Sequence, residues 1–150
     1  MKSGLSLLCV AAALASSPVF AVSCQDEVHK VNVALHSVLD EAELTGMLRT
    51  LNATHNRDLP DKFVTKRAAI AAGWQRGHDL WEAPALRGKS IGGDRYGNRE
   101  RQLPAGRWRE ADLDYKGGHR GAKRLIFSTQ GWRFVTVDHY QTYTELAACQ

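Results

Sequence analysis

The stretch Arg124–Val137, RLIFSTQGWRFVTV, indicates the fold of this chain more clearly than any other. Two runs rich in β-branched and aromatic residues, 124–128 and 132–137, flank a glycine at position 131, as in a β-hairpin. Further runs of the same texture are separated by Gly, Pro, Asn and Asp, and they lie at residues 91–96, 108–113 and 142–146. We therefore predict an antiparallel sheet of hairpin-connected strands towards the end of the chain.

Before these runs, apolar residues recur at steps of three and four, which is typical of amphipathic helices. Asp40 and Glu43 have the spacing of a capping box, in which two side chains cap one helix start reciprocally. We therefore expect two helices over residues 25–52, with a break near Asp40. The apolar stripes that would face the core are Val28, Val31, Leu35 and Val38 in the first helix and Leu44, Met47, Leu48 and Leu51 in the second.

A shorter helix is expected between the two parts of the chain. Thr65 is a good N-cap, residues 66–72 favour a helix and Gly73 can close it. One more helical turn is expected within residues 78–83. Helices first and strands afterwards predict an α+β fold, with N-terminal helices packed against a twisted antiparallel β-sheet.

Residues 1–21 have the features of a secretory signal peptide. An apolar run over residues 5–15 follows a positive charge, and Val19 and Ala21 are the small residues that a signal peptidase needs. The run is shorter than the ~20 residues of a membrane-spanning helix. We therefore expect cleavage after Ala21 and a protein secreted to the extracellular space or the periplasm, with no membrane association. A lipobox over residues 21–24 is the weaker alternative, because alanine is a poor first residue for it.

About 129 residues remain after cleavage, enough for one domain with one core. We expect residues 22–58 to form an N-terminal helical segment and residues 59–150 the main core, both within a single folded domain. Cys24 and Cys149 remain in the mature chain, and two thiols in an exported protein predict a disulfide. Neither cysteine has a ligand at zinc-binding spacing, so no metal site is expected.

Charge is unevenly distributed along the mature chain. Residues 22–61 hold three Lys or Arg and seven Asp or Glu, a balance of −4, whereas residues 62–150 hold sixteen and nine, a balance of +7. A basic second part suits a polyanionic partner, and this signal leaves open whether that partner is a nucleic acid or an acidic membrane surface.

The residues that could carry chemistry lie among the predicted strands. In the run 108–112, alternation places Glu110 and Asp112 on one strand face, where acids are most often simply solvated. Two arginines and then His139 follow downstream. Cleaving RNA without a metal requires a base for the 2′-hydroxyl, an acid for the departing 5′-oxygen and fixed cations around the phosphorus. A carboxylate, a histidine and several cations that converge on one sheet face would supply all three.

Residues 59–146 resemble the barnase family of microbial guanyl-specific ribonucleases, within the ribonuclease N1/T1 superfamily. Seven short stretches carry this resemblance, and they occur in the same order along the chain. They are Leu59-Pro60-Asp61, Thr65-Lys66, Ala72-Gly73-Trp74, Gly88-Lys89-Ser90-Ile91-Gly92-Gly93-Asp94, Asn98-Arg99-Glu100, Trp108-Arg109-Glu110-Ala111-Asp112 and Asp138-His139-Tyr140-Gln141-Thr142.

The resemblance implies an acid–base pair. Glu110 corresponds to the general base that accepts the 2′-hydroxyl proton, and His139 to the general acid that protonates the 5′-oxygen. The product would be a guanosine 2′,3′-cyclic phosphate, which the same pair would hydrolyse to the 3′-phosphate with exchanged roles. The residues that correspond to the surrounding cations are Lys66, Arg120 and Arg124, and the acid that positions them corresponds to Asp94.

The resemblance also implies a guanine site in the loop from Tyr96 to Glu100. Glu100 would accept hydrogen bonds from guanine N1 and N2, which adenine cannot donate. Backbone N–H groups near Asn98 and Arg99 would meet O6, and the Arg99 side chain would lie against the base. Tyr140 corresponds to an aromatic residue beside the bound base.

Single-stranded RNA is therefore the expected partner, and no cofactor is expected. The family further implies an acidic intracellular inhibitor protein similar to barstar, and we expect the secreted chain to be a monomer. The alternative from another class is a secreted cationic polyanion binder, which would bind RNA and leave it intact. Asp112 and Tyr115 are expected to be structural, and the tryptophans expected in the core are Trp74, Trp108 and Trp132.

Overall fold

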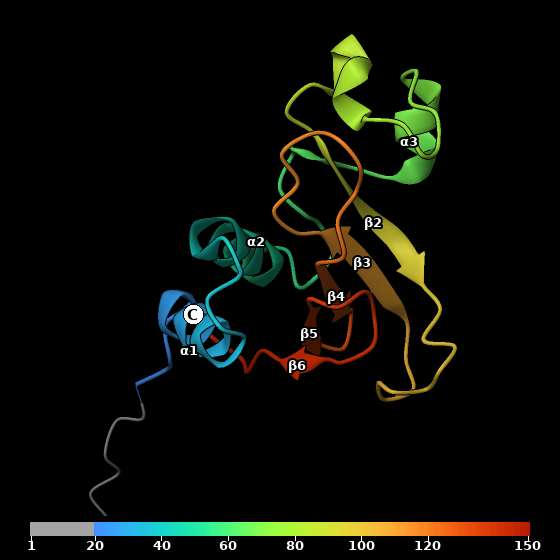
Figure 1. Ribbon diagram of the computed structural model, residues 1–150. Coiled ribbons are helices and arrows are strands. Elements are labelled where there is room, and N and C mark those ends of the chain that lie inside the picture. The colour runs from blue at the N-terminus through green and yellow to red at the C-terminus, as the bar shows by residue number, and fades with distance from the viewer. Residues whose placement is uncertain (1–19) are drawn as a thin grey trace, which may run out of the picture.

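The computed structural model describes residues 20–150 (Figure 1), so most of the expected signal peptide lies outside the described residues. None of the helices in this part of the chain is long and apolar enough to cross a membrane. In chain order the α-helices, 3-10 turns (η) and strands are α1 (Cys24–Ala34), α2 (Glu41–Ala53), β1 (Phe63–Val64), α3 (Lys66–Ala71), η1 (Leu80–Glu82), η2 (Pro84–Leu86), β2 (Ser90–Tyr96), β3 (Trp108–Asp112), β4 (Arg124–Ser128), β5 (Arg133–Thr136) and β6 (Thr144–Glu145).

The sheet has the strand order β1-β2-β3-β4-β5-β6, and every neighbouring pair from β2 to β6 is antiparallel. In Figure 1, α1 and α2 lie together on one side of the sheet, while α3 lies near the start of β2. The predicted α+β fold is confirmed. One detail corrects the prediction of a purely antiparallel sheet: β1 pairs with β2 in parallel, because the chain crosses over through α3 and the two 3-10 turns between them.

Local hydrogen bonds explain where the helices begin. The Asp40 side chain accepts from the Glu43 N–H at the start of α2, and Thr65 accepts from the Ala68 N–H at the start of α3. The expected reciprocal bond, from the Asp40 N–H to the Glu43 side chain, does not form. The Asp40 N–H donates to the Asp114 carboxylate at 3.2 Å, and Glu43 Oε2 accepts from the Asp114 N–H at 2.8 Å. Glu43 therefore ties α2 to the segment after β3.

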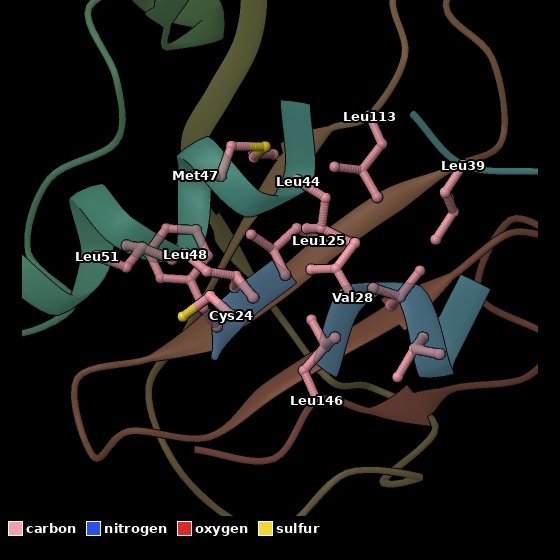
Figure 2. Packing of buried hydrophobic residues seen from close by; sticks show 14 of the residues in the cluster. Cys24, Val28, Leu39, Leu44, Met47, Leu48, Leu51, Leu113, Leu125 and Leu146 are labelled. Atoms are coloured by element: carbon pink, nitrogen blue, oxygen red, sulfur yellow. The ribbon is translucent and has the colours of Figure 1, made fainter. Parts of the chain in front are cut away.

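The main core lies between the first two helices and the sheet. Figure 2 shows Val28 of α1, Leu44 and Leu48 of α2, and Leu125 of β4 meeting in one cluster. All four side chains are buried, so these positions of the predicted stripes face the sheet. Val38 is 41% exposed and follows the end of α1 at Ala34, which corrects its place in the first stripe. A second cluster, around Trp74, packs α3 and the 3-10 turns against β2.

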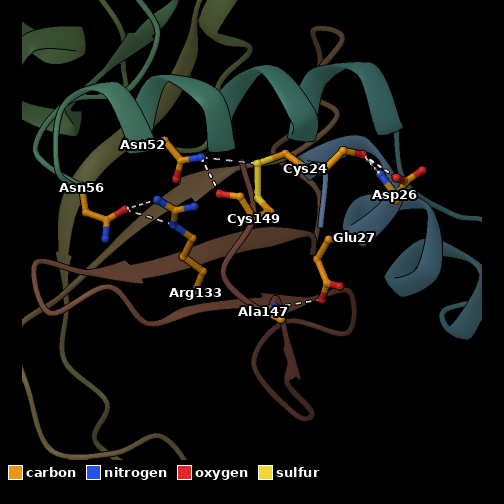
Figure 3. The surroundings of a disulfide bond; sticks show 9 residues. Cys24, Asp26, Glu27, Asn52, Asn56, Arg133, Ala147 and Cys149 are labelled. Carbon is orange, nitrogen blue, oxygen red and sulfur yellow. Dashed lines mark hydrogen bonds between the residues drawn. A yellow bond between two sulfur atoms is a disulfide. The ribbon is translucent and has the colours of Figure 1, made fainter. Parts of the chain in front are cut away.

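The structure joins Cys24 to Cys149 in the predicted disulfide, which links the start of α1 to the C-terminal end of the chain (Figure 3). Hydrogen bonds surround this link. The Cys24 N–H donates to Gln150 O at 2.9 Å, and the Asn52 side chain of α2 donates to Cys149 O at 2.9 Å. The disulfide thus ties the C-terminal segment to α1, and the Asn52 hydrogen bond ties it to α2.

Candidate active site

The sheet face opposite α1 and α2 carries the two acids of β3. Side chains alternate along this strand, so Ala111 packs into the helical core while Glu110 and Asp112 lie on the other face. These acids differ from ordinary solvated strand acids, because the exposed fractions of Glu110 and Asp112 are only 8% and 3%. Buried carboxylates require charged or hydrogen-bonding partners, and each of the two has them.

Glu110 is held between a hydrogen-bond donor and a cation. Tyr140 Oη donates to Glu110 Oε2 at 2.6 Å, and Lys66 Nζ lies 3.7 Å from Oε1. Burial, followed by the bond to Glu110, raises the pKa of Tyr140 above its ordinary value. The tyrosine hydroxyl therefore keeps its proton at neutral pH and remains a donor to the carboxylate.

Asp112 holds both arginines predicted for the site. Arg120 donates to its two carboxylate oxygens at 2.7 Å from Nε and 2.7 Å from Nη2. Arg124 Nε lies 3.0 Å from Asp112 Oδ1, and its guanidinium carbon lies 5.9 Å from the centre of the Tyr140 ring. The hydrogen bonds to Asp112 raise the pKa of Arg120. Two guanidinium groups on one carboxylate leave a net positive charge beside Glu110.

Asp94 is the cross-strand neighbour of Glu110. Its Oδ2 accepts from the Lys66 backbone N–H at 2.9 Å, which fixes the start of α3 beside the sheet. Two residues earlier, Gly92 lets the Phe63 side chain of β1 pack closely on β2, because a Cβ there would lie 2.6 Å from Phe63 Cδ1. Asp94 thus contacts the backbone of the predicted lysine, whereas Asp112 contacts the predicted arginines. Asp112 was expected to be structural, and its contacts with Arg120 and Arg124 had no signal in the sequence.

His139 and Tyr140 lie in a turn with left-handed backbone angles, φ 54° and φ 70°. The Asp138 carboxylate holds the turn: it accepts from the Thr136 hydroxyl at 3.0 Å and from the Gln141 N–H at 3.1 Å. It also accepts from the hydroxyl and N–H of Thr142 at 2.5 and 2.9 Å. The His139 ring is exposed and its centre lies 4.8 Å from that of Tyr140. One tyrosine therefore separates the histidine from Glu110.

The bonds to Asp138 predict a pH-dependent stability. Hydrogen bonds from Thr142 first, then from Thr136 and Gln141, lower the pKa of Asp138 from 3.8 to about 2. Because the folded pKa lies below the unfolded one, its contribution is fully present above pH 3.8 and is lost as the pH falls through about 2. We expect Asp138→Asn to lower Tm at pH 7 by about 2–5 °C, a modest shift because the side chain is only partly buried and solvent screens its charge.

Thermal unfolding between pH 2 and pH 7 checks this expectation. The difference in Tm between wild type and Asp138→Asn should shrink as the pH approaches 2. The exposed Asp61→Asn is the matched control and should follow the wild type throughout. A difference that stays constant over the whole pH range would contradict the linkage.

The loop after β2 forms the predicted base-binding region. Tyr96 stacks on Tyr140, with ring centres 5.3 Å apart and planes at 14°, so this loop adjoins the Glu110 site. The Asn98 side chain closes the loop on itself by donating to Leu103 O at 2.9 Å. Arg99 and Glu100 are exposed, and within residues 20–150 no hydrogen bond or ion pair joins either side chain to the Glu110 site. Their part in base recognition stays a prediction.

A cavity of about 310 Å³ lies beside the predicted cations. His78 and His119 are exposed and line it. Pairing of distant loops creates this cavity, so no local sequence signal indicates it. Its full lining is Lys66, Trp74, Arg76, Gly77, His78, His119 and Arg120.

The three tryptophans that were expected in the core divide into two groups. Trp74 and Trp108 are buried, as expected, with exposed fractions of 5% and 2%. Trp132 is 42% exposed, which corrects the expectation of a core position. It lies just before β5 and stacks on Phe134, with ring centres 6.3 Å apart. The strand alternation therefore places it on the same face as Phe134, at the rim of the sheet.

No group of three or more His, Cys, Asp or Glu side chains in residues 20–150 is placed to hold a metal ion. A family model described as ribonuclease matches residues 49–147, which include every predicted catalytic residue. Curated ribonucleases of Bacillus intermedius and Bacillus pumilus are each 47% identical over 93 residues, which cover 59% of this chain and 56% of the relative. A ribonuclease of Heyndrickxia coagulans is 46% identical over 93 residues, covering 83% of that relative.

The matched stretch thus spans little more than half of the two Bacillus proteins. The residues that the family model matches include the whole sheet with α3, together with the loop and turn around Glu110. The family match extends over more than half of this chain. The chain belongs to the barnase family of microbial ribonucleases.

Proposed function

We propose that this chain is a secreted, metal-independent endoribonuclease that cleaves single-stranded RNA after guanosine. The observation that carries the proposal is the fixed position of Glu110, which is bonded to Tyr140 at 2.6 Å and lies 3.7 Å from Lys66. A buried carboxylate among cations, with an exposed histidine on the far side of Tyr140, can move a proton while phosphate charge is stabilised around it. The Cys24–Cys149 disulfide supports export, because such bonds persist in oxidising compartments.

In the first step, the Glu110 carboxylate takes the proton of the 2′-hydroxyl as the 2′-oxygen forms a bond to phosphorus. The bond from phosphorus to the 5′-oxygen breaks, and His139 gives its proton to that oxygen. The products are a 2′,3′-cyclic phosphate and a free 5′-hydroxyl. In the second step, His139 takes a proton from water as the water oxygen forms a bond to phosphorus. The bond from phosphorus to the 2′-oxygen breaks, Glu110 gives its proton to that oxygen, and a 3′-phosphate remains.

Three cations are available for the charge that develops on the phosphate. Lys66 and Arg120 line the cavity of about 310 Å³, and Arg124 shares the Asp112 carboxylate with Arg120. Asp112 orients the planar fork of Arg120, so little rearrangement is needed when charge develops. Lys66 is oriented through its backbone bond to Asp94.

Guanine preference is the finer part of the proposal. Glu100 would accept from guanine N1 and N2, with backbone N–H groups near Asn98 and Arg99 meeting O6. The stacked pair Tyr96 and Tyr140 gives the base a neighbouring aromatic surface. An acidic inhibitor protein in the producing cell and a monomeric secreted form remain predictions of the same family relationship.

Replacing Glu100 by glutamine tests the specificity. We expect kcat/KM for a guanosine-containing dinucleotide to fall by about 10- to 100-fold, because charge-assisted hydrogen bonds of about 1.5–3 kcal/mol are weakened. The rate of cleavage after adenosine should change much less, so the preference for guanosine over adenosine becomes smaller. The measurement is the rate on matched guanosine and adenosine substrates. An unchanged ratio of the two rates would remove Glu100 from base recognition.

A gel assay tests the activity against the rival reading as a polyanion binder. The folded protein is incubated with a labelled single-stranded RNA in the presence of a chelator. An enzyme of the proposed kind shortens the RNA, since no step requires a metal. Retarded RNA of full length would instead support a binding protein and overturn the proposal.

A further inference from the structure

The sheet face that packs against α1 and α2 carries a row of arginines at one end. The cross-strand pairs Arg95–Arg109, Arg109–Phe127 and Phe127–Arg133 run through β2, β3, β4 and β5 in register. The row thus sets two arginines directly opposite each other on neighbouring strands. Like charges in that position are destabilising unless something offsets them.

Two members of the row have structural partners. Arg109 Nη2 donates to Asn56 O at 2.7 Å, and its guanidinium carbon lies 4.8 Å from the centre of the Phe127 ring. Arg133 donates from Nε to Asn56 Oδ1 at 3.0 Å, as Figure 3 shows. These partners are neutral, so the positive charges stay uncompensated. Arg109 and Arg133 thus hold the loop at Asn56, whereas Arg95 does not contact it through a hydrogen bond.

Arg95 and the nearby Arg107 have no such explanation. Both are exposed, and neither takes part in a side-chain hydrogen bond or an ion pair within residues 20–150. Together with Arg109 they line a cavity of about 580 Å³, a size within the ~300–1,000 Å³ of typical ligand sites. No acidic residue lines the cavity, and its other lining residues are Gly93, Trp108 and Thr129. Three guanidinium groups and a threonine hydroxyl are ligands for phosphate.

This cavity, which we call the rear arginine site, is connected to the proposed RNA face by a free sheet edge. β1 pairs with β2 only at Ser90 and Ile91, so the end of β2 has no neighbouring strand on its outer side. Arg95 and Tyr96 are consecutive there and lie on opposite faces. A strand of RNA whose base lies near Tyr96 can therefore pass around this edge and meet Arg95 next.

We propose that the rear arginine site, formed by Arg95, Arg107 and Arg109, binds phosphate groups of single-stranded RNA that continues around the edge of β2. The ligand assignment rests on the proposed ribonuclease function, whereas the anion site itself does not. The site adds affinity for long strands and takes no part in the proton transfers. Short substrates that fill only the Glu110 face do not reach it.

Binding of single-stranded DNA tests the site, because DNA lacks the 2′-hydroxyl and is not cleaved. The probes are a labelled strand of about 20 nucleotides, longer than a typical ~4–16 nucleotide site, and one of about 4 nucleotides, each with one guanine. In Arg95→Gln/Arg107→Gln we expect affinity for the long probe at about 0.1 M salt to fall about tenfold. The plot of log affinity against log salt should become shallower by about 1.4, or about 0.7 per lost phosphate contact.

The short probe and the cleavage rate of a guanosine dinucleotide should be unchanged in this double variant. The matched control, Arg49→Gln/Arg87→Gln, removes two exposed charges elsewhere and should keep the salt dependence of the wild type. The proposed site would be overturned if both double variants lost the same affinity for the long probe. It would also be overturned if Arg95→Gln/Arg107→Gln lost as much affinity for the short probe as for the long one. Thermal unfolding of each variant confirms that the fold is retained.

Two further experiments distinguish RNA from other ligands that carry phosphate groups. Displacement of the long probe by inorganic phosphate, at concentrations that leave the short probe bound, would assign the cavity to a small phosphate ligand and overturn the continuous RNA path. Loss of binding to vesicles rich in phosphatidylserine, with oligonucleotide binding unchanged, would assign it to a membrane surface instead. If the wild type shows the predicted DNA binding but cleaves no RNA, the enzymatic function fails while the anion site stands.

Discussion

The Glu110→Gln variant is expected to lose about 100- to 10,000-fold in the rate of RNA transphosphorylation, the usual contribution of a positioned general base. Glutamine keeps the shape of the side chain and can still accept from Tyr140 Oη, whose bond to the carboxylate measures 2.6 Å. It cannot take the proton of the 2′-hydroxyl. The loss should therefore appear in kcat, and KM should change little.

The measurement is the initial rate of cyclic-phosphate formation from a guanosine dinucleotide, with unfolding curves of the same samples. Tyr140→Phe is the matched control: it removes the hydroxyl that holds Glu110 and keeps the carboxylate. We expect a smaller loss there, about tenfold, because the base is less well fixed but still present. A Glu110→Gln rate within a factor of about three of the wild type would exclude Glu110 as the base.

Asp112→Asn is expected to destabilise the protein more than any other single substitution at the site. We expect it to lower the free energy of unfolding by about 3–5 kcal/mol. Asp112 is 3% exposed, and its carboxylate is the shared partner of Arg120 and Arg124. Without that charge, the Arg124 guanidinium, which is only 4% exposed, has no compensating partner of opposite sign at this position. The cleavage rate should fall as well, because Arg120 loses its orientation.

Denaturant unfolding at neutral pH measures this loss of stability. Glu145→Gln, which removes one acid from the exposed strand β6, is the control and should lie within about 0.5 kcal/mol of the wild type. Equal stability of Asp112→Asn and Glu145→Gln would show that the buried ion pairs do not hold this part of the fold. Retained folding with low activity would separate the positioning role from the structural one.

Much of the fold follows from local patterns in the sequence. The runs at 91–96 and 124–128 differ from β2 and β4 by one residue or less, because runs of β-branched and aromatic residues between turn-forming residues are a strong signal. β1 consists of Phe63 and Val64 alone, and two residues cannot show a period. Its parallel pairing depends on the whole crossover through α3, which no local pattern reveals. Glu43 does not complete the capping box because it bonds instead to the N–H of Asp114, which lies 71 residues further along the chain.

The sequence provided candidate residues for the site but no indication of the contacts between them. Motifs identified Glu110, Lys66 and His139 without showing that Tyr140 would bond to Glu110. Tyr140 was expected beside a base, and its ring does stack on Tyr96, while its hydroxyl faces the carboxylate. Long-range pairs of this kind depend on strand register and on the left-handed turn at 139–140, which form only in the folded chain.

Digestion of one short RNA that contains each base once, in the presence of a chelator, tests the central claim most directly. The masses of the products identify both the cleaved bond and the chemical end groups. We predict a single cut after guanosine, with an initial 2′,3′-cyclic phosphate on one product and a 5′-hydroxyl on the other. Intact RNA from folded protein, or products that carry 5′-phosphates, would contradict the Glu110 and His139 mechanism.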